Sequence, residues 1–452
     1  MNLAASFLYA KKIIFPKKSN VSRGTKSLFG AMICIGISLI PLVAILTVSE
    51  GMIDGITHRM IELSSHDLQI YVENSDWKKS SYQEIENFAK KIQEIPEIPE
   101  IKKSYPEISC SALVSGKNYR SGAYVRAIEK NLFQSDKGFN EYFELVAGER
   151  KLENQNDAII GKHLSEVLDL KVGDSFRIIT INRAGKAAVP KLSSFVVKGI
   201  VTSGYQELDA LWIFIPIESA FKSLALNSCE FTIGLSSDFT FDNQRLFKLQ
   251  NDVQDFLYSE KFFENSYVIR WDEANRSQFE NFSSTKALLL LIVLIILLAA
   301  SINISSGVVM LVMERKKEIA ILKSTGASSF GISFAFLIAG TSCGIGGLLF
   351  GLPIGLFVSI NVNEIIKFFE NVANFFVNIF NILIYSKNSI NLTAANVHIL
   401  NPDYYLQKIP INIPIQKLIL MSIFTLVLSM IMALIPSIKA GKEKPINTLR
   451  KL

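Results

Sequence analysis

Four apolar stretches of the 452-residue chain are too long for the helices of a soluble protein. A helix that rises about 1.5 Å per residue needs about 20 apolar residues to cross a hydrocarbon core of roughly 30 Å. We therefore predict transmembrane helices over residues 28–50, 285–313, 330–360 and 415–436.

The third of these stretches has glycines at four-residue spacing, at Gly347, Gly351 and Gly355. Residues at this spacing lie on one face of a helix, and small residues there allow a second helix to approach closely. The pattern predicts a tightly packed helix pair, although glycine is also tolerated in membrane helices without such a role.

A fifth apolar stretch, residues 363–385, has a polar stripe along one side. Asparagine and charged residues recur there at steps of three and four, opposite phenylalanine and isoleucine. A charged residue at the bilayer centre costs about 3 kcal/mol. We therefore predict an amphipathic helix in the outer membrane interface and no crossing at this point.

Residues 51–284 have mixed polarity and lie between the first two predicted spans. Short β-rich runs alternate with amphipathic helical stretches, and residues 157–181 predict a strand, a helix, a Gly-Asp turn and a second strand. A segment of this size can bury its own core. We expect a large α+β domain, which must be extracytoplasmic because one membrane crossing precedes it.

The distribution of charge predicts the topology. The chain has 47 Lys and Arg, 41 Asp and Glu and a net charge of +6, yet residues 51–283 carry about seven more acidic than basic residues. Basic segments are retained in the cytoplasm, so both termini are predicted to be cytoplasmic, with a short helix of the N-terminal segment on the inner surface. The predicted segments are 1–27 (inner surface), 28–50 (span), 51–284 (outer domain), 285–313 (span), 314–329 (cytoplasmic segment), 330–360 (span), 361–414 (outer loop), 415–436 (span) and 437–452 (cytoplasmic tail).

Motifs for catalysis are absent from the sequence. We find no phosphate-binding loop, no hydrolase motif and no His/Cys cluster with metal-ligand spacing. The predicted spans contain almost no ionisable residues, which disfavours a proton or ion relay. We expect a non-enzymatic subunit without a metal or cofactor of its own, which takes its energy from a separate subunit.

The chain has four cysteines. Cys34 and Cys343 lie in apolar stretches and are expected to be inert. Cys110 and Cys229 lie in the outer domain, where an oxidising compartment would permit a disulfide. Their spacing leaves open whether they form one.

The order of elements resembles the permeases of the MacB/FtsX-like class of ABC transporters. The segment ERKKEIAILKSTGAS is similar to the segment with which these permeases dock on their ATPase. A narrower resemblance is to the lipoprotein-releasing permeases of the LolC/LolE type. It rests on DAIIGKHLSEVLDLKVGD, FVVKGIVTSGYQELDALWIFIPIESA, DYYLQKIPINI and the tail ALIPSIKAGKEKPINTLRKL, and covers most of the chain.

The resemblance implies a non-catalytic permease subunit of an ATP-driven complex in the bacterial inner membrane. This complex would extract lipoproteins from the outer leaflet and pass them to a periplasmic carrier. The implied partners are a LolD-like ATPase that binds ATP and Mg, a second permease subunit, the lipoprotein and a LolA-like carrier. An FtsX-like permease that activates an extracytoplasmic partner without moving lipid is the alternative. The sequence leaves open whether the permease pair is a homodimer or a heterodimer and which lipoproteins it handles.

The cytoplasmic segment is the candidate site for coupling to the ATPase, and a topological loop is the alternative. In a helix, Arg315, Glu318, Ile319 and Leu322 share one face, which we expect to enter the ATPase groove with Ile319 and Leu322 buried. The candidate coupling residues are Glu314, Arg315, Lys316, Glu318, Ile319, Leu322, Lys323 and Gly326.

Two further sites are expected outside the cytoplasm. The loop between two predicted strands matches the position of the carrier-contacting loop in the family and has an unusual apolar tip. An ordinary hairpin turn is the alternative. The candidate carrier contacts are Lys186, Ala187, Ala188, Val189 and Pro190. An apolar cavity for the substrate's acyl chains is expected from Val48, Met52, Ile53, Ile56, Phe279 and Phe282, with plain helix packing as the alternative.

Overall fold

The computed structural model describes residues 3–14, 23–73, 75–93, 95, 100–184, 187–260, 265–385, 406 and 409–444. The chain forms two compact units. One, the membrane unit, comprises Met1–Met52, Phe282–Ala394 and Ile409–Leu452, and the other, the outer unit, comprises Ile53–Asn281 and Ala395–Lys408.

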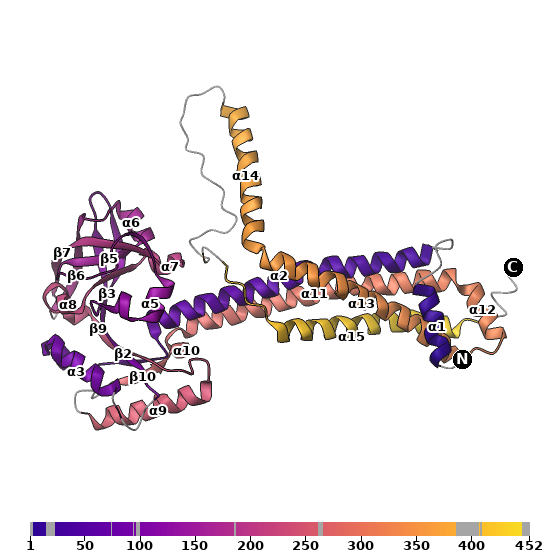
Figure 1. Ribbon diagram of the computed structural model, residues 1–452, viewed down its shortest axis with the longest axis horizontal. Coiled ribbons are helices and arrows are strands. Elements are labelled where there is room, and N and C mark those ends of the chain that lie inside the picture. Colours follow the sequence, from indigo (N-terminus) through magenta and orange to yellow (C-terminus); the bar gives the residue numbers. More distant parts are fainter. Residues whose placement is uncertain are drawn as a thin grey trace. The chain divides into compact units, whose positions relative to one another are not determined.

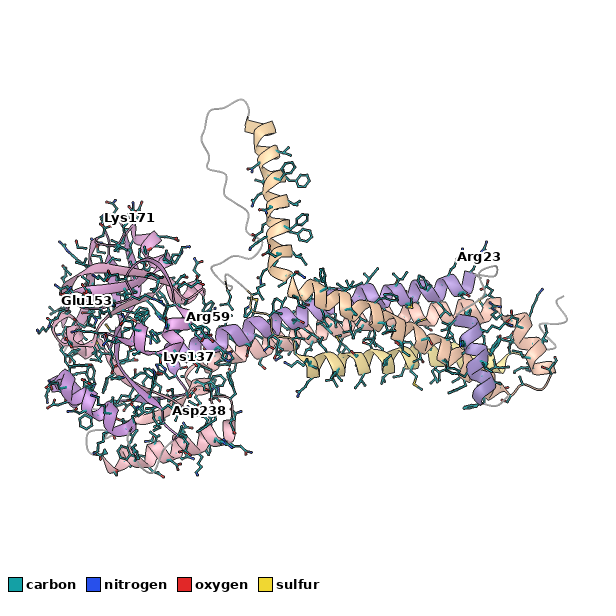
Figure 2. All side chains as sticks on the ribbon, in the orientation of Figure 1. Arg23, Arg59, Lys137, Glu153, Lys171 and Asp238 are labelled. Atoms are coloured by element: carbon teal, nitrogen blue, oxygen red, sulfur yellow. The ribbon has the colours of Figure 1, made fainter. Side chains whose placement is uncertain are left out.

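Among the residues that the structure describes, four helices are long and apolar enough to cross a membrane (Figure 1). They are α2 (Arg23–Met60), α11 (Arg276–Glu314), α13 (Ser329–Ile360) and α15 (Ile415–Lys442). Each contains one of the stretches predicted from the sequence. Charged residues lie at both ends of α2, and Figure 2 shows Arg23 at its start and Arg59 near its end.

Three shorter helices complete the described part of the membrane unit. They are α1 (Leu3–Ile14), α12 (Lys316–Ser324) and α14 (Val362–Tyr385). The amphipathic stretch after the third span is therefore a separate helix, as predicted. On α14, Glu364 pairs with Lys367 at 3.0 Å, while Phe368 and Phe376 are exposed. The position of α14 in the outer interface stays a prediction.

Helix α13 packs closely on α2 through its glycines. A Cβ at Gly347 would lie 2.6 Å from the Ile35 Cγ2 atom, and one at Gly351 would lie 2.7 Å from the carbonyl oxygen of Gly36. A Cβ at Gly355 would lie 2.8 Å from the Cβ of Val43. The prediction that these glycines permit a close helix pair is confirmed.

The outer unit is built on a ten-stranded sheet. Its strands are β1 (Leu68–Tyr71), β2 (Lys103–Ser115), β3 (Arg120–Ile128), β4 (Glu144–Gly148), β5 (Asp157–Gly161), β6 (Ser175–Ala184), β7 (Ala187–Thr202), β8 (Trp212–Pro216), β9 (Glu230–Ser236) and β10 (Tyr267–Arg270). The order is β10-β1-β9-β2-β3-β8-β5-β7-β4, and β6 pairs with both β2 and β7. The strands β2, β3, β8, β5, β7 and β6 therefore close a ring.

Helices connect these strands. They are η1 (Ile61–Ser65), η2 (Ser75–Lys79), α3 (Tyr82–Gln93), α4 (Leu132–Ser135), α5 (Lys137–Tyr142), α6 (Lys162–Leu168), α7 (Gln206–Asp209), α8 (Ile217–Ser223), η3 (Leu226–Ser228), α9 (Asn243–Ser259) and α10 (Trp271–Ala274). The predicted strand, helix, turn and strand of residues 157–181 are β5, α6, a turn at Gly173 and β6. Gly173 has a φ of +89°, a left-handed conformation that favours glycine.

A buried ion pair joins the sheet to the segment that follows α2. Arg126 is 2% exposed, and its Nε and Nη2 atoms donate to the Glu107 carboxylate at 2.7 and 2.6 Å. Its Nη1 atom donates to the carbonyl of Leu63 in η1 at 2.5 Å. Because both side chains are buried, removing either one would leave the other as an unpaired buried charge and lower the free energy of unfolding by about 3–5 kcal/mol.

The two cysteines of the outer unit lie on neighbouring strands. Ser109 pairs with Glu230 in the antiparallel β2–β9 ladder, so Cys110 and Cys229 are opposite each other at the next position. Both are buried free thiols that share a hydrogen bond. The hydrogen bond to Cys110, together with burial, raises the pKa of the Cys229 thiol well above its usual range. The structure thus brings together the two thiols whose pairing the sequence left open.

The glycine contact between α13 and α2 generates a stability prediction. Replacing Gly351 with Ala would force the two backbones apart and destabilise the bundle by about 1–3 kcal/mol. The G351A variant should therefore show a lower midpoint of thermal unfolding in detergent. The matched control is G30A on α2, since a Cβ at Gly30 meets no atom within 4 Å. Equal midpoints for the two variants would contradict close packing at Gly351.

Candidate functional site

The charged segment between α11 and α13 is a helix with a break on each side. Helix α12 begins after Arg315, which has a non-helical backbone, and ends at Thr325. Gly326 follows with a φ of +95°, which allows the chain to reverse at this point. The Ser328 hydroxyl accepts a hydrogen bond from the Gly331 amide at 3.2 Å and begins α13. The prediction of a helical segment is confirmed.

The face of α12 that is free to meet a partner differs from the predicted one. Ile319 is 0% exposed, because it packs into the core of its own membrane unit, and Leu322 is half-buried. In this structure Ile319 therefore offers no exposed surface to a partner, and the docking of α12 on an ATPase stays a prediction. The exposed face is formed by Lys317, Ile321 and Thr325, with Ile321 at 56% exposure.

Glu314, the last residue of α11, binds the first turn of α2. Its carboxylate accepts hydrogen bonds from the amides of Arg23 at 2.9 Å and Gly24 at 2.5 Å. The first amides of a helix have no partner within the helix and carry a partial positive charge, so a carboxylate there stabilises the helix start. A Cβ at Gly24 would lie 2.8 Å from the Cα of Leu311, which explains the glycine.

Two lysines of α12 bind the end of α15. The Lys316 Nζ atom lies 3.1 Å from the Glu443 carboxylate, and Lys323 donates to the Glu443 carbonyl at 2.8 Å. Each such contact is partly exposed and contributes about 0–1 kcal/mol. Glu443, the residue that follows α15, thereby fixes the position of both ends of α12.

Arg315 and Glu318, two further charges of the segment, are also engaged. Arg315 pairs with Glu318, and the Tyr9 hydroxyl of α1 donates to Glu318 at 3.5 Å. Burial and the negative charge of Glu318 raise the pKa of Tyr9 above its usual range. The structure therefore connects α12 to α1 and to the end of α15, and the end of α11 to α2. Sequence reasoning did not predict these contacts, because the partners are distant along the chain.

The predicted carrier loop is the turn of the β6–β7 hairpin. Ala184 pairs with Ala187 and Ile181 with Pro190, so the predicted hairpin is confirmed. Lys186 lies outside the described residues, and Ala187 and Ala188 are described only by their backbone. Val189 is 53% exposed and Pro190 is also exposed. The role of these residues in carrier contact stays a prediction.

The apolar surface of the hairpin extends beyond the predicted tip. Ile181 and Leu192 are 50% and 57% exposed, and Leu113 of the neighbouring β2 is exposed as well. A groove of about 650 Å³ begins here and is lined by Leu113, Ile179, Ile181 and Pro190 among others. Alternation along the strands could have identified these residues, because side chains two apart share one face.

The predicted substrate residues fall on two helices. Val48, Met52, Ile53 and Ile56 follow one another on α2, and Phe279 and Phe282 lie on α11. Ile56 is buried, and Phe279 packs on Trp271 with ring centroids 4.9 Å apart, as in ordinary packing. The others are half-buried, and the substrate cavity stays a prediction.

An ion-paired cluster at the opposite end of the membrane unit from α12 was also missed. Glu50 of α2 lies 3.1 Å from the Nζ atom of Lys286 of α11 and also pairs with Lys417 of α15. In the sequence, Glu50, Lys286 and Lys417 are single charged residues at the ends of three apolar stretches. This pattern does not predict that they contact one another. The cluster connects three of the four apolar helices.

Two family models match the chain. Residues 28–243 match the MacB-like periplasmic core domain, and residues 290–386 match the FtsX-like permease C-terminal region. The LolC transmembrane protein of the lipoprotein-releasing system of Neisseria meningitidis serogroup B is 26% identical over 438 residues, which cover 92% of each chain. The chain is a relative of the lipoprotein-releasing permeases.

Other relatives support the same resemblance. LolC of Xylella fastidiosa strain 9a5c is 24% identical over 78% of each chain, and LolE of Haemophilus influenzae is 22% identical over 80% of each chain. The periplasmic region of MacB from Actinobacillus actinomycetemcomitans covers 48% of this chain and 94% of that chain at 15% identity, with a TM-score of 0.30 that supports no argument about the fold.

These relatives confirm the resemblance predicted from the sequence to LolC/LolE-like permeases of the MacB/FtsX class. The chain is a membrane protein with a periplasmic domain, and its relatives are permease components of ABC transporters. This class implies an ATPase and a partner permease. Relatives of both LolC and LolE type are matched, so the comparisons do not assign the chain to one type.

The contact between α12 and α15 can be tested by chemical cross-linking. In a variant without native cysteines, cysteines at Lys316 and Glu443 should be joined by a short bifunctional thiol reagent, because the two side chains meet. Cysteines at Lys317 and Glu443 should react much less, because Lys317 is on the exposed face. Equal yields, measured by mass spectrometry after proteolysis, would contradict the described attachment of α12.

Proposed function

We propose that this chain is a permease subunit of an ATP-driven complex that extracts lipoproteins from the outer leaflet of the bacterial inner membrane. The complex hands them to a LolA-like periplasmic carrier. A LolD-like ATPase supplies the energy and binds ATP and Mg, and a second permease completes the membrane part. The observation that carries the proposal is the similarity to LolC over 92% of both chains.

The membrane topology of the proposal has four crossings with cytoplasmic termini. It is supported by four sufficiently long and apolar helices and by the basic residues of the N-terminal segment, α12 and the tail. In this arrangement α12 is at the cytoplasmic face and the hairpin β6–β7 is in the periplasm.

Helix α12 would transmit the movement of the ATPase. Its exposed face, formed by Lys317, Ile321 and Thr325, is available for docking. Its buried side packs Ile319 into the membrane unit, while Glu443 attaches it to α15. Since Glu443 contacts both Lys316 and Lys323, a push on the exposed face of α12 would displace α15 together with it.

The hairpin β6–β7 would contact the carrier. An exposed apolar surface of this kind on a soluble domain is typical of a binding site. Ile181, Pro190 and Leu192 lie on one face of the hairpin, and their exposed surface can cover an apolar partner. Both an acyl chain and the apolar surface of an acyl-chain carrier have the required chemistry.

The proposal is tested by lipoprotein release from liposomes that contain the chain, its ATPase and its partner permease. With ATP and carrier, a labelled triacylated lipoprotein should appear on the soluble carrier. The K316E variant places a like charge beside Glu443 and should lose release several-fold while its abundance in the membrane is unchanged. The charge-swapped K316E/E443K variant should recover.

Two results would count against the proposal. ATP hydrolysis without release by the wild type would favour the alternative, a permease that activates an extracytoplasmic partner without moving lipid. Full release by K316E would contradict transmission through the contact between α12 and α15 and leave the substrate assignment intact.

A further inference from the structure

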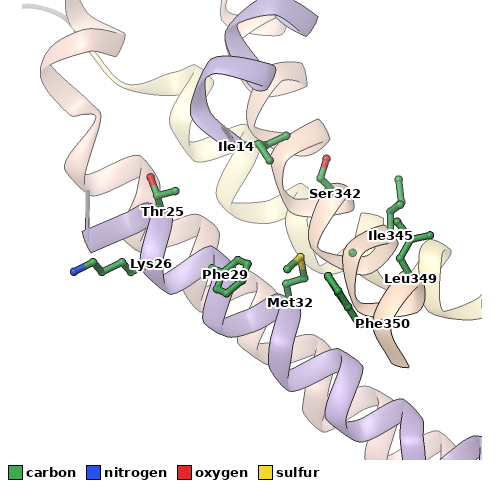
Figure 3. A pocket seen from close by; sticks show the side chains of 10 residues that line it. Ile14, Thr25, Lys26, Phe29, Met32, Ser342, Ile345, Leu349 and Phe350 are labelled. Carbon is green, nitrogen blue, oxygen red and sulfur yellow. The ribbon is translucent and has the colours of Figure 1, made fainter. Parts of the chain in front are cut away.

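An apolar groove of about 760 Å³ lies in the membrane unit between α1, α2 and α13. Its size is within the roughly 300–1,000 Å³ of typical ligand pockets. Figure 3 shows Phe29 and Met32 of α2 opposite Leu349 and Phe350 of α13, with Lys26 at the end of the row nearest the start of α2. The groove is thus apolar along its length and cationic at one end.

The groove is formed by the local packing of α2 and α13. A Cβ at Gly346 would lie 2.7 Å from the Cγ atom of Met32, so the glycine leaves room for that side chain. Phe29, Leu349 and Phe350 are all more than half exposed. The side chain of Ile14, from α1, closes the groove on a third side.

Several cations near the mouth have no anionic partner within the described residues. Lys26 is exposed and makes no ion pair with any residue that the structure describes. The same holds for Arg23 at the start of α2 and for Lys11 and Lys12, which lie within one turn of Ile14 on α1. Each of the four lines the groove or lies within one helical turn of a residue that does, and we refer to them together as the basic cluster.

The chain has few acidic residues with which a second copy could match this cluster. The segments 1–27, 314–329 and 437–452 contain only Glu314, Glu318 and Glu443. Glu314 binds the first turn of α2, Glu318 binds Arg315, and Glu443 binds Lys316. A second copy of this chain therefore has no free acidic residue in these segments to pair with the basic cluster. The positive charge of the cluster favours a different, anionic ligand.

We propose that this groove binds an anionic phospholipid of the leaflet that faces the cytoplasm, with an acyl chain between α2 and α13 and the phosphate at Lys26. Apolar burial holds the chain, at about 0.8 kcal/mol for each buried CH₂. Basic pockets between membrane helices on the cytoplasmic side suit phospholipid head groups. The site is distinct from the outer-leaflet substrate path, and it does not depend on transport.

Native mass spectrometry of the full chain in detergent tests this site with phosphatidylglycerol as the probe. The wild type should retain one molecule of phosphatidylglycerol at least about fivefold more tightly than phosphatidylcholine of the same chains. The K26E variant should lose this preference, and M32W, which fills the groove, should lose binding of both lipids. The matched control is K442E, since Lys442 is an exposed lysine near the end of α15 that does not line the groove.

Three outcomes would overturn the proposal. One is equal retention of the two lipids by the wild type, and another is equal loss in K26E and K442E, which would indicate a diffuse effect of net charge. The third is unchanged phosphatidylglycerol binding by M32W together with loss of self-association or of partner-permease association in light scattering. That result would assign the groove to a protein interface. Thermal unfolding of each variant in the same detergent shows whether it is folded.

Discussion

The attachment of α12 to the membrane helices is the constraint on which the account of this protein depends. A charged nine-residue helix at a membrane surface has little stability of its own. Burial of Ile319 and the contacts of Lys316 and Lys323 with Glu443 hold it in place. Because the segment is held on one side only, its other side is free to receive a partner. In the proposed function, force applied there would reach the long helices through packed side chains.

The same helices must be stiff enough to carry that force. Close packing of α13 on α2 through Gly347, Gly351 and Gly355 provides this stiffness, since small residues maximise backbone contact in a lipid environment. At the other end of the membrane unit, Glu50 joins three helices through Lys286 and Lys417. A movement of α12 would therefore displace the helices of the membrane unit together, with little bending of any single helix.

The sequence was informative wherever a periodic pattern determined the structure. The apolar stretches, the glycine face of α13, the amphipathic α14 and the elements from β5 to β6 were predictable, because each depends on neighbours along the chain. The burial of Ile319 in the membrane unit was not predictable. The spacing of residues identifies a helix face, but it does not show which element packs on that face. The groove beside Lys26 and the contacts of Glu443 join segments more than a hundred residues apart, and a single sequence contains no signal for them.

The most direct test of the attachment of α12 is the distance between spin labels at Lys317 and Lys442, measured by double electron–electron resonance in the assembled complex. The account predicts a single narrow distance distribution that is the same without nucleotide and during ATP hydrolysis, because α12 and the end of α15 move together. A distribution that shifts or broadens during hydrolysis would show that α12 moves independently of α15 and would contradict the account.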